Sequence, residues 1–535
     1  MTARTRATAV VLLAALTLAG TTGCTQSPDE TTLTIGTTDK VTGLDPAGSY
    51  DTGSFTVMNQ VYPFLMNTAY GSADPEPDIA ASAQFTTPTE FTVTLKPDLV
   101  FANGHALTAS DVKFSFDRQL EIKDPNGPSA LLANLDRTEL VNDLTVVFHL
   151  KTDYDQTFAQ VLASPAGPVV DEEVFSATAL TPDHEIVSGK AFAGPYTITS
   201  FHLNETVSYR ANPQYKGMLD APRTERVNVS YYARSSSLKR DVQQGVVHVA
   251  YRGLSLADLN DVRKDDHVRV VQSPAGEIRY LVFNLDSQPF GAGTDDDDPA
   301  KALAVRQAVA HLIDREALSD HVYNGTFVPL YSYVPAGVTG ATSVLEELYG
   351  DGTGGSSLDQ ATAVLAEAEV PTPVALTVQY TSDHYGPSSA DEYALIKGQL
   401  EAGGLFRVKL ATAEWAVFSA DRRADLYPAY QLGWFPDYCD ADNYLTPFFA
   451  PDSFVANHFS DPEIVDQLAA QRAAADPTER AELLAGLQAD LAAALPTLPY
   501  LQGTQVAVTG TNVAGVERTL DASGKFRYGA LALTS

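Results

Sequence analysis

Helical and extended segments alternate regularly along the second half of this 535-residue chain. The hydrophobic patterns predict helices over 358–368, 389–402 and 413–422, each followed by a strand, over 374–380, 405–411 and 427–433. A further helix is predicted over 477–494. Regular alternation of this kind is typical of an α/β layer, so we expect an α/β fold.

The first half of the chain is richer in hairpins. The segment "YTITSFHLNETVSYRA" predicts two strands that turn at Asn204–Glu205, as expected for an α+β lobe. Because 535 residues exceed one ordinary hydrophobic core, we predict two unlike lobes with a boundary near Ser273–Tyr280. The first lobe is expected over 25–279 and the second over 280–496, with 497–535 returning to the first.

The formal charge of −32 restricts the possible partners. Nucleic-acid binding requires a basic surface, and no dense basic cluster is present in the sequence, so we expect no nucleic-acid partner.

The N-terminal segment "MTARTRATAVVLLAALTLAGTTGC" has the organisation of an export signal. The apolar run Val10–Ala19 is too short to span a bilayer but suits a signal peptide. The small residues before Cys24 resemble a bacterial lipoprotein signal, in which this cysteine is lipidated, although Thr21 stands where a leucine is usual. We predict that 1–24 is a lipoprotein signal and that Cys24 anchors the exported protein to the membrane, with cleavage by an ordinary signal peptidase as the alternative.

Two further segments have the composition of ligand sites but fit simpler roles. The run Asp295–Asp298 contains possible calcium ligands, yet four adjacent aspartates suit a solvated loop ending in a helix cap. The segment 350–357, "GDGTGGSS", lacks the Gly-Lys-Ser/Thr of a phosphate loop and is interpreted as a linker. No zinc-binding or serine-hydrolase motif occurs, so we predict no metal and no cofactor.

The segment "GWFPDYCDADNYLTPFF" places three aspartates among aromatic residues. A calcium loop starting at Asp437 would need a glycine and a glutamate at its twelfth position, where Phe448 stands. Asp440 or Asp442 is interpreted as a cap for a helix that begins near Asn443.

Asp437 follows the predicted strand 427–433 just beyond its C-terminal end, where open α/β sheets bind their ligands. An ionised aspartate in a partly dry aromatic cleft favours a cationic partner. A surface or helix-capping aspartate and an acid–base pair with Asp440 are the alternatives.

Five blocks of the sequence, in order, resemble one known family. They are "DPAGSYDTGSFTVMNQVYPFL", "LKPDLVFANGHALTASDVKFSFDR", "AGPYTI", "VFNLDSQPF…VRQAVAHLIDREAL" and "GWFPDYCDADNY". The chain from about Leu33 to its C-terminus is similar to the extracytoplasmic solute-binding proteins of peptide ABC transporters, the dipeptide/oligopeptide-binding family (solute-binding family 5).

The resemblance implies a type II periplasmic-binding-protein (venus-flytrap) fold, with two lobes joined by two crossovers and an extra subdomain of about 55–185 inserted in the first lobe. It implies that Asp437 receives the α-ammonium of a peptide and that Trp434 helps to wall the cleft. The backbone at Gly433 and Phe435, together with the loop residues Ser49, Tyr50, Asp51 and Thr52, would pair with the peptide main chain.

The chain departs from the family pattern at two positions. Asp440-Ala441-Asp442 stands where many members have Asp-Pro, and Gln431 stands where some oligopeptide binders have an arginine. How the carboxylate of a peptide is held is therefore left open.

The function expected from the resemblance is that of a monomeric, non-enzymatic receptor anchored by a lipid, which delivers peptides to the membrane permease of an ABC importer. Three alternatives stay open: the same scaffold binding a nickel chelate, haem or an oligosaccharide; an exported hydrolase that uses Asp437 and Asp440; and a sensory or adhesive surface protein.

Overall fold

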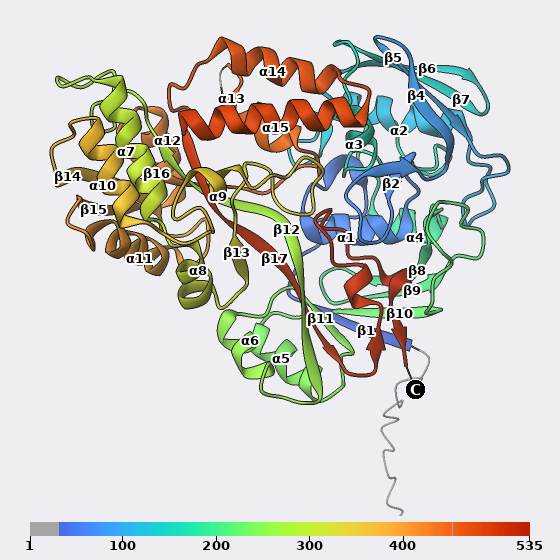
Figure 1. The fold of residues 1–535 in the computed structure, drawn as a ribbon. Coiled ribbons are helices and arrows are strands. Elements are labelled where there is room, and N and C mark those ends of the chain that lie inside the picture. The colour runs from blue at the N-terminus through green and yellow to red at the C-terminus, as the bar shows by residue number, and fades with distance from the viewer. Residues whose placement is uncertain (1–31, 452, 535) are drawn as a thin grey trace, which may run out of the picture.

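The computed structural model describes residues 32–451 and 453–534, and within them an eleven-stranded mixed sheet runs through the molecule (Figure 1). The strands are β1 Thr32–Thr37, β8 Tyr196–His202, β9 Thr206–Ala211, β10 Arg226–Tyr231, β11 Val249–Tyr251, β12 Val268–Phe283, β13 Phe327–Pro329, β14 Val374–Thr381, β15 Phe406–Ala413, β16 Ala429–Trp434 and β17 Thr497–Gly510. Neighbouring strands follow the order β15-β14-β16-β12-β17-β11-β1-β10-β9-β8, and β13 pairs with β17. The predicted signal peptide 1–24 and its Cys24 lie outside the described residues.

Two long antiparallel strands, β12 and β17, connect the two halves of the sheet (Figure 1). We call the part before β12 the first lobe and the part between β12 and β17 the second lobe. By their hydrophobic patterns alone, 268–272 and the segment "RYLVFNL" (279–285) are predicted to be two separate strands. The structure has one strand, with a break in its pairing to β17 between Pro274 and Ile278. The predicted boundary, 273–280, thus falls inside β12, and the limits of the lobes stay a prediction.

The second lobe confirms the predicted α/β alternation. Its helices before β16 are α7 Pro299–Leu312, α8 Arg315–Leu318, α9 Val344–Leu348, α10 Leu358–Glu367, α11 Ser389–Glu401 and α12 Trp415–Arg423. β14 runs parallel to both β15 and β16, as helical crossovers require. Asp298 caps α7, accepting bonds from the amides of Ala300 and Lys301, so the acidic run 295–298 ends in a helix start as predicted.

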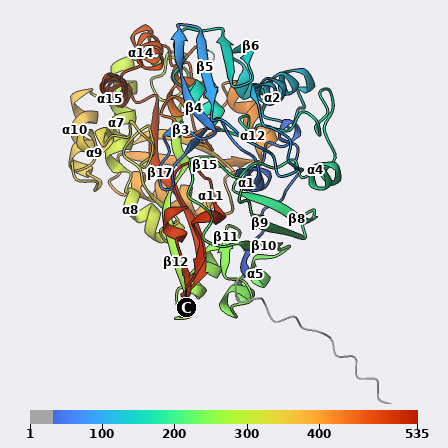
Figure 2. The same ribbon diagram turned by 90° about the vertical axis from the view of Figure 1, so that its right-hand side faces the viewer.

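The first lobe combines its half of the sheet with a separate subdomain. In the subdomain the strands β4 Ala80–Thr87, β5 Glu90–Leu95, β6 Leu135–Asn142 and β7 Thr145–Leu150 form an antiparallel sheet in the order β4-β5-β7-β6. Figure 2 shows these strands at the end of the molecule opposite the C-terminus. The segment "LTASDVKFSFDRQL" predicts a helix that starts with a capping box of Thr108 and Asp111. The helix α2, Ala109–Ile122, has this capping box and packs Phe116 against Phe148. The strands of this sheet lie between residues 80 and 150, and the limits of the subdomain, about 55–185, stay a prediction.

The C-terminal segment after β17 packs into the core of the first lobe. Val513, Val516 and Phe526 belong to the same buried cluster as Leu33 and Val249 from β1 and β11. The end of the chain therefore joins the lobe in which the described chain begins.

Three helices near the top of Figure 1 connect the second lobe to the subdomain: α13 Asp442–Phe449, α14 Pro462–Ala473 and α15 Pro477–Ala494. At the end of α14, the Arg472 carbonyl accepts a bond from the Gln156 amide at 3.1 Å. The guanidinium of Arg472 lies 3.3 Å from the Asp155 carboxylate, so the two lobes touch here across the subdomain.

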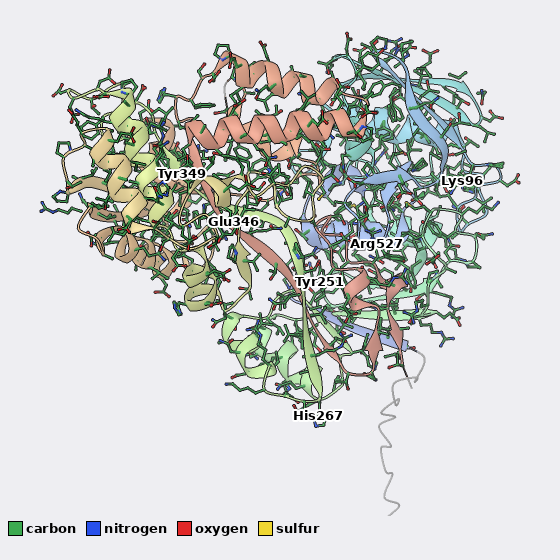
Figure 3. The ribbon with its side chains drawn as sticks, in the orientation of Figure 1. Lys96, Tyr251, His267, Glu346, Tyr349 and Arg527 are labelled. Atoms are coloured by element: carbon green, nitrogen blue, oxygen red, sulfur yellow. The ribbon has the colours of Figure 1, made fainter. Side chains whose placement is uncertain are left out.

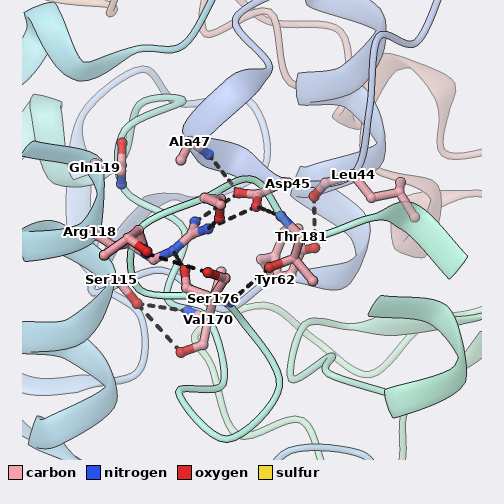
Figure 4. Close-up of polar contacts among 12 residues, drawn as sticks. Leu44, Asp45, Ala47, Tyr62, Ser115, Arg118, Gln119, Val170, Ser176 and Thr181 are labelled. Atoms are coloured by element: carbon pink, nitrogen blue, oxygen red, sulfur yellow. Dashed lines mark hydrogen bonds and ion pairs between the residues drawn. The ribbon is translucent and has the colours of Figure 1, made fainter. Parts of the chain in front are cut away.

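A buried ion pair fixes the segment that leads into the loop 49–52 (Figure 4). Both terminal nitrogens of Arg118 donate to the two carboxylate oxygens of Asp45 at 2.8 Å. Asp45 also accepts bonds from the amides of Ala47, at 3.0 Å, and Thr181, at 2.7 Å. Because a buried carboxylate is stable only with its polar partners in place, this network holds the backbone before Ser49 in one position.

Candidate functional site

A cavity of about 730 Å³ lies between the two lobes and is lined by both. The first lobe contributes residues 50–52 and 252–254, the second lobe contributes 435–439, and the C-terminal segment contributes 522–525. The connecting strands β12 and β17 contribute 275–277 and 504–506. A molecule in this cavity would touch both lobes and both strands that join them, which is the arrangement expected of a ligand site between domains.

Asp437 is the centre of the candidate site. It lies half-buried in the turn after β16 and lines the cavity. Its carboxylate accepts a hydrogen bond from the Tyr50 hydroxyl of the first lobe and one of 3.4 Å from Asn443 Nδ2. In the part of the chain that the structure describes, no Lys, Arg or His nitrogen forms an ion pair with Asp437, so its partners there are neutral donors.

The turn that carries Asp437 is held by one asparagine. The Asn443 side-chain oxygen accepts bonds from the Asp437 amide, at 3.0 Å, and from the Trp434 indole nitrogen, at 2.9 Å. Partial burial and the adjacent Asp437 carboxylate together raise the pKa of Tyr50 above its ordinary value, so Tyr50 donates its proton rather than ionising.

The predicted site residues divide into two groups. Tyr50, Asp51, Thr52, Phe435 and Asp437 line the cavity. Phe435 is 52% exposed, an unusually large exposure for a phenylalanine ring at a cavity wall. Asp51 also caps the helix α1, Thr52–Val61, by accepting a bond from the Ser54 amide.

The other three predicted residues lie behind the cavity wall. Gly433 is buried in β16 opposite Arg279, and Trp434 packs edge-on against Phe448 with the ring centroids 5.0 Å apart. Ser49 is buried before the loop. None of the three lines the cavity among the described residues, and their role in binding stays a prediction.

The other two aspartates of the segment are already engaged. Asp440 forms a paired contact with Arg480 of α15, with N–O distances of 2.8 and 2.7 Å, and also accepts the amide of Asp442. Asp442 bonds Thr446 and Gln471, and burial raises its pKa to about 6. The helix α13 begins at Asp442 without a side-chain N-cap, so Asp440 supports its first turn and Asp442 does not cap it.

The cavity wall also contains charged residues that the sequence did not single out, Arg252, Glu277 and Lys525. Lys525 is buried, its Nζ donates to Asn67 Oδ1 at 2.9 Å, and burial followed by the nearby Arg527 lowers its pKa to about 7. These three residues come from distant segments of the chain. The only local signal is the sequence Tyr251-Arg252-Gly253 directly after a strand, which could have pointed to Arg252.

The described residues offer neither a metal site nor a membrane-spanning helix. Their His, Cys, Asp and Glu side chains form no group of three or more that could hold a metal ion. Over the same residues, every helix is too short or too polar to cross a bilayer. The free Cys439 is buried at the cavity wall, and burial raises the pKa of its thiol.

Comparison with known proteins shows which family the chain resembles over most of its length. The family model of bacterial extracellular solute-binding proteins, family 5 Middle, matches residues 74–455. The chain belongs to this family. The resemblance seen in the sequence blocks is thereby confirmed, and the matched relatives are binding proteins.

Relatives of this family-5 protein match it over different lengths. The periplasmic oligopeptide-binding protein OppA of Salmonella typhimurium (strain LT2) is 23% identical over 525 residues, 93% of this chain and 92% of its own length. The probable D,D-dipeptide-binding periplasmic protein DdpA of Escherichia coli (strain K12) is 26% identical over 314 residues, so the match spans 58% of each chain.

The solved structure of HbpA2 from Haemophilus parasuis has the same fold, with a TM-score of 0.80, 21% identity, and coverage of 94% of this chain and 100% of that one. The expected two-lobed periplasmic-binding-protein fold is confirmed.

Proposed function

We propose that this family-5 protein captures peptides between its two lobes and delivers them to the membrane permease of an ABC importer. The observation that carries the proposal is the position of Asp437, a carboxylate that lines the inter-lobe cavity and has only neutral partners among the described residues. The names of OppA and DdpA, which are peptide-binding proteins, support the choice of ligand.

In this proposal Asp437 binds the α-ammonium of the peptide. A hydrogen bond between charged partners contributes about 1.5–3 kcal/mol, which corresponds to about 10- to 150-fold in affinity. When no ligand is present, the Tyr50 hydroxyl donates a hydrogen bond to the Asp437 carboxylate. When the ammonium binds, Tyr50 either moves away or shares the carboxylate with it. Because Tyr50 and Asp437 belong to different lobes, their contact also brings the lobes together.

The backbone of Phe435 and of the loop 50–52, residues that line the cavity, then pairs with the peptide main chain through the groups that are not already bonded within the protein, as the Tyr50 amide is to the Asn126 carbonyl. Main-chain pairing is indifferent to side chains, so peptides of varied sequence are bound. Export and attachment through a lipid on Cys24 complete the proposal, and both are supported by the N-terminal sequence pattern. The receptor acts as a monomer and catalyses no reaction.

The experiment compares trialanine with its N-acetylated form by isothermal titration calorimetry. The native protein is expected to bind the free amine about 10- to 150-fold more tightly, because acetylation removes the positive charge. Asp437→Asn should bind both forms with similar, weak affinity, while the control Asp466→Asn, which makes the same change of charge at an exposed position of α14, should behave like the native protein.

Two results would overturn the proposed role of Asp437. One is equal binding of the free and acetylated peptides by the native protein. The other is a preference for the free amine that persists in Asp437→Asn.

A further inference from the structure

The charged side chains of the cavity wall differ in the hydrogen bonds and ion pairs that they already form with other protein groups. The wall carries Asp51, Arg252, Glu277, Asp437 and Lys525. Asp51 caps α1, Glu277 lies 2.6 Å from the Arg279 guanidinium, and Lys525 donates to Asn67. Asp51 and Lys525 are thus bonded to neutral groups, and burial lowers the pKa of Lys525 to about 7. Arg252 is therefore the cation of this wall that stays charged over the whole physiological pH range, and it has no ion-pair partner in the described residues.

Arg252 follows β11 and its backbone is in the left-handed region. Its φ is 63°, and that of the next residue, Gly253, is 81°. A left-handed arginine is strained, and such strain persists where the surrounding structure holds a residue in place for a purpose. The bend carries the arginine side chain to the cavity wall.

The guanidinium of Arg252 rests on an aromatic side chain instead of a carboxylate. Its central carbon lies 5.6 Å from the centroid of the Tyr251 ring. Asp39 and Glu277 act on it at longer range: burial alone would lower the pKa of Arg252, but these carboxylates and Tyr251 raise it. The side chain is therefore a permanent cation at the cavity.

The aromatic support is itself rigid. The Tyr251 ring stacks on Phe526 with centroids 3.9 Å apart and planes 10° apart, and its hydroxyl donates to Gln505 Oε1 at 2.8 Å. Figure 3 labels Tyr251 in the middle of the molecule, close to β12 and β17. A guanidinium held on a fixed ring loses little freedom when it binds a ligand.

We propose that Arg252 binds the carboxylate of the peptide whose ammonium binds Asp437. The inference rests on the proposed function and assigns the group that the sequence left open. The planar guanidinium donates two parallel hydrogen bonds to a carboxylate, which makes arginine the preferred partner for this group. Gln431 stands where related oligopeptide binders have an arginine, but its side chain is buried and bonded to Thr381 and Ser389. It is therefore not free to bind the carboxylate of a ligand.

The assignment gives each lobe one end of the ligand. Asp437 belongs to the second lobe and Arg252 to the first. A peptide with both termini free then bridges the lobes through two charged contacts, whereas a peptide blocked at either end binds one lobe more strongly than the other.

The test measures the binding of trialanine, its C-terminal amide and its N-acetyl form by calorimetry. The native protein is expected to bind the free peptide about 10- to 100-fold more tightly than the amide. Arg252→Gln should reduce this preference to less than threefold and keep the preference for a free amine, which shows that the rest of the site is intact. The control Arg240→Gln removes an exposed arginine of the same lobe and should keep both preferences.

Each outcome decides between the two proposals. If the native protein penalises acetylation but not amidation, the role of Asp437 stands and that of Arg252 falls. If Arg252→Gln keeps the full preference over the amide, another cation such as Lys525 holds the carboxylate and the inference is wrong. If the native protein binds no trialanine, or penalises neither change, the proposed function fails and this inference fails with it.

Discussion

Replacing Arg480 by methionine should destabilise the turn that carries Asp437. Both terminal nitrogens of Arg480 donate to Asp440, at 2.8 and 2.7 Å, and the two side chains are only 17% and 7% exposed. Removing one partner of a buried pair costs about 3–5 kcal/mol because the other charge stays buried without compensation, and the partial exposure of Arg480 favours the lower end. Arg480 also donates to the carbonyl of Gln471, so a second bond is lost with it.

The loss of about 3 kcal/mol can be converted into a change in Tm through the number of folded residues. With an unfolding entropy of about 2.1 cal/mol/K per residue, roughly 500 folded residues give about 1 kcal/mol per degree at the midpoint, so a loss of about 3 kcal/mol lowers Tm by about 3 °C. Urea unfolding followed by circular dichroism gives the same free energy independently.

A double-mutant cycle separates the pair from its surroundings. Asp440→Asn keeps an oxygen for the Asp442 amide but removes the charge. The variant with both changes should therefore recover about 2 kcal/mol relative to the sum of the single variants. A cycle in which the two single costs simply add, or an Arg480→Met variant within about 0.5 kcal/mol of the native protein, would refute the argument.

Two further predictions concern the contacts around the cavity. Tyr50→Phe removes the hydrogen bond to Asp437 that joins the lobes, so the radius of gyration of the ligand-free protein, measured by small-angle X-ray scattering, should increase; an unchanged radius would contradict this role. Lys525→Met removes a buried lysine whose pKa falls from 10.5 to about 7 on folding. Between these values the unfolded chain binds the extra proton, so this lysine makes the native protein more stable as the pH rises from 7 towards 10.5, and its charged form is most costly below pH 7. The stability of Lys525→Met relative to the native protein should thus decrease by about 2–3 kcal/mol between pH 6 and pH 9, as measured by urea unfolding; a difference independent of pH would show that the burial of Lys525 has no effect on its titration.

The features that the sequence predicted correctly are local ones. The caps at Thr108 and Asp298 depend on residues within one helical turn, so their patterns are readable without knowing the rest of the fold. The α/β alternation of the second lobe was readable for the same reason.

The central strand β12 was divided in two because Pro274 and Gly276 interrupt the pattern expected of a strand. In the structure, pairing with β17, more than two hundred residues away in the chain, keeps the backbone extended on both sides of this interruption. No local pattern contains that information.

The candidate site was only partly accessible from the sequence. Asp437 could be proposed from its place after a predicted strand and from the resemblance to one family, and Tyr50 from that resemblance alone. Trp434 packs on Phe448, and its role in binding stays a prediction. Arg252 lies at the cavity because a left-handed bend and a tyrosine from the preceding strand place it there. The left-handed backbone at Arg252, and the meeting of its segment with 275–277 and 522–525 at the cavity, have no signature in the linear sequence.

The interruption in β12 has a mechanical consequence. In the described residues the chain passes between the lobes only along β12 and β17, so any rotation of one lobe against the other must bend these two strands. Pro274 and Ile278 pair with Thr504 and Gln502, but the pairing with β17 is interrupted between them, so we expect this interruption to be the pivot of such a rotation. Residues 275–277 of that pivot also form part of the cavity wall. A bound ligand would therefore contact β12 at the residues where we expect this strand to bend, so that binding and the rotation of the lobes would be coupled directly through the backbone of β12.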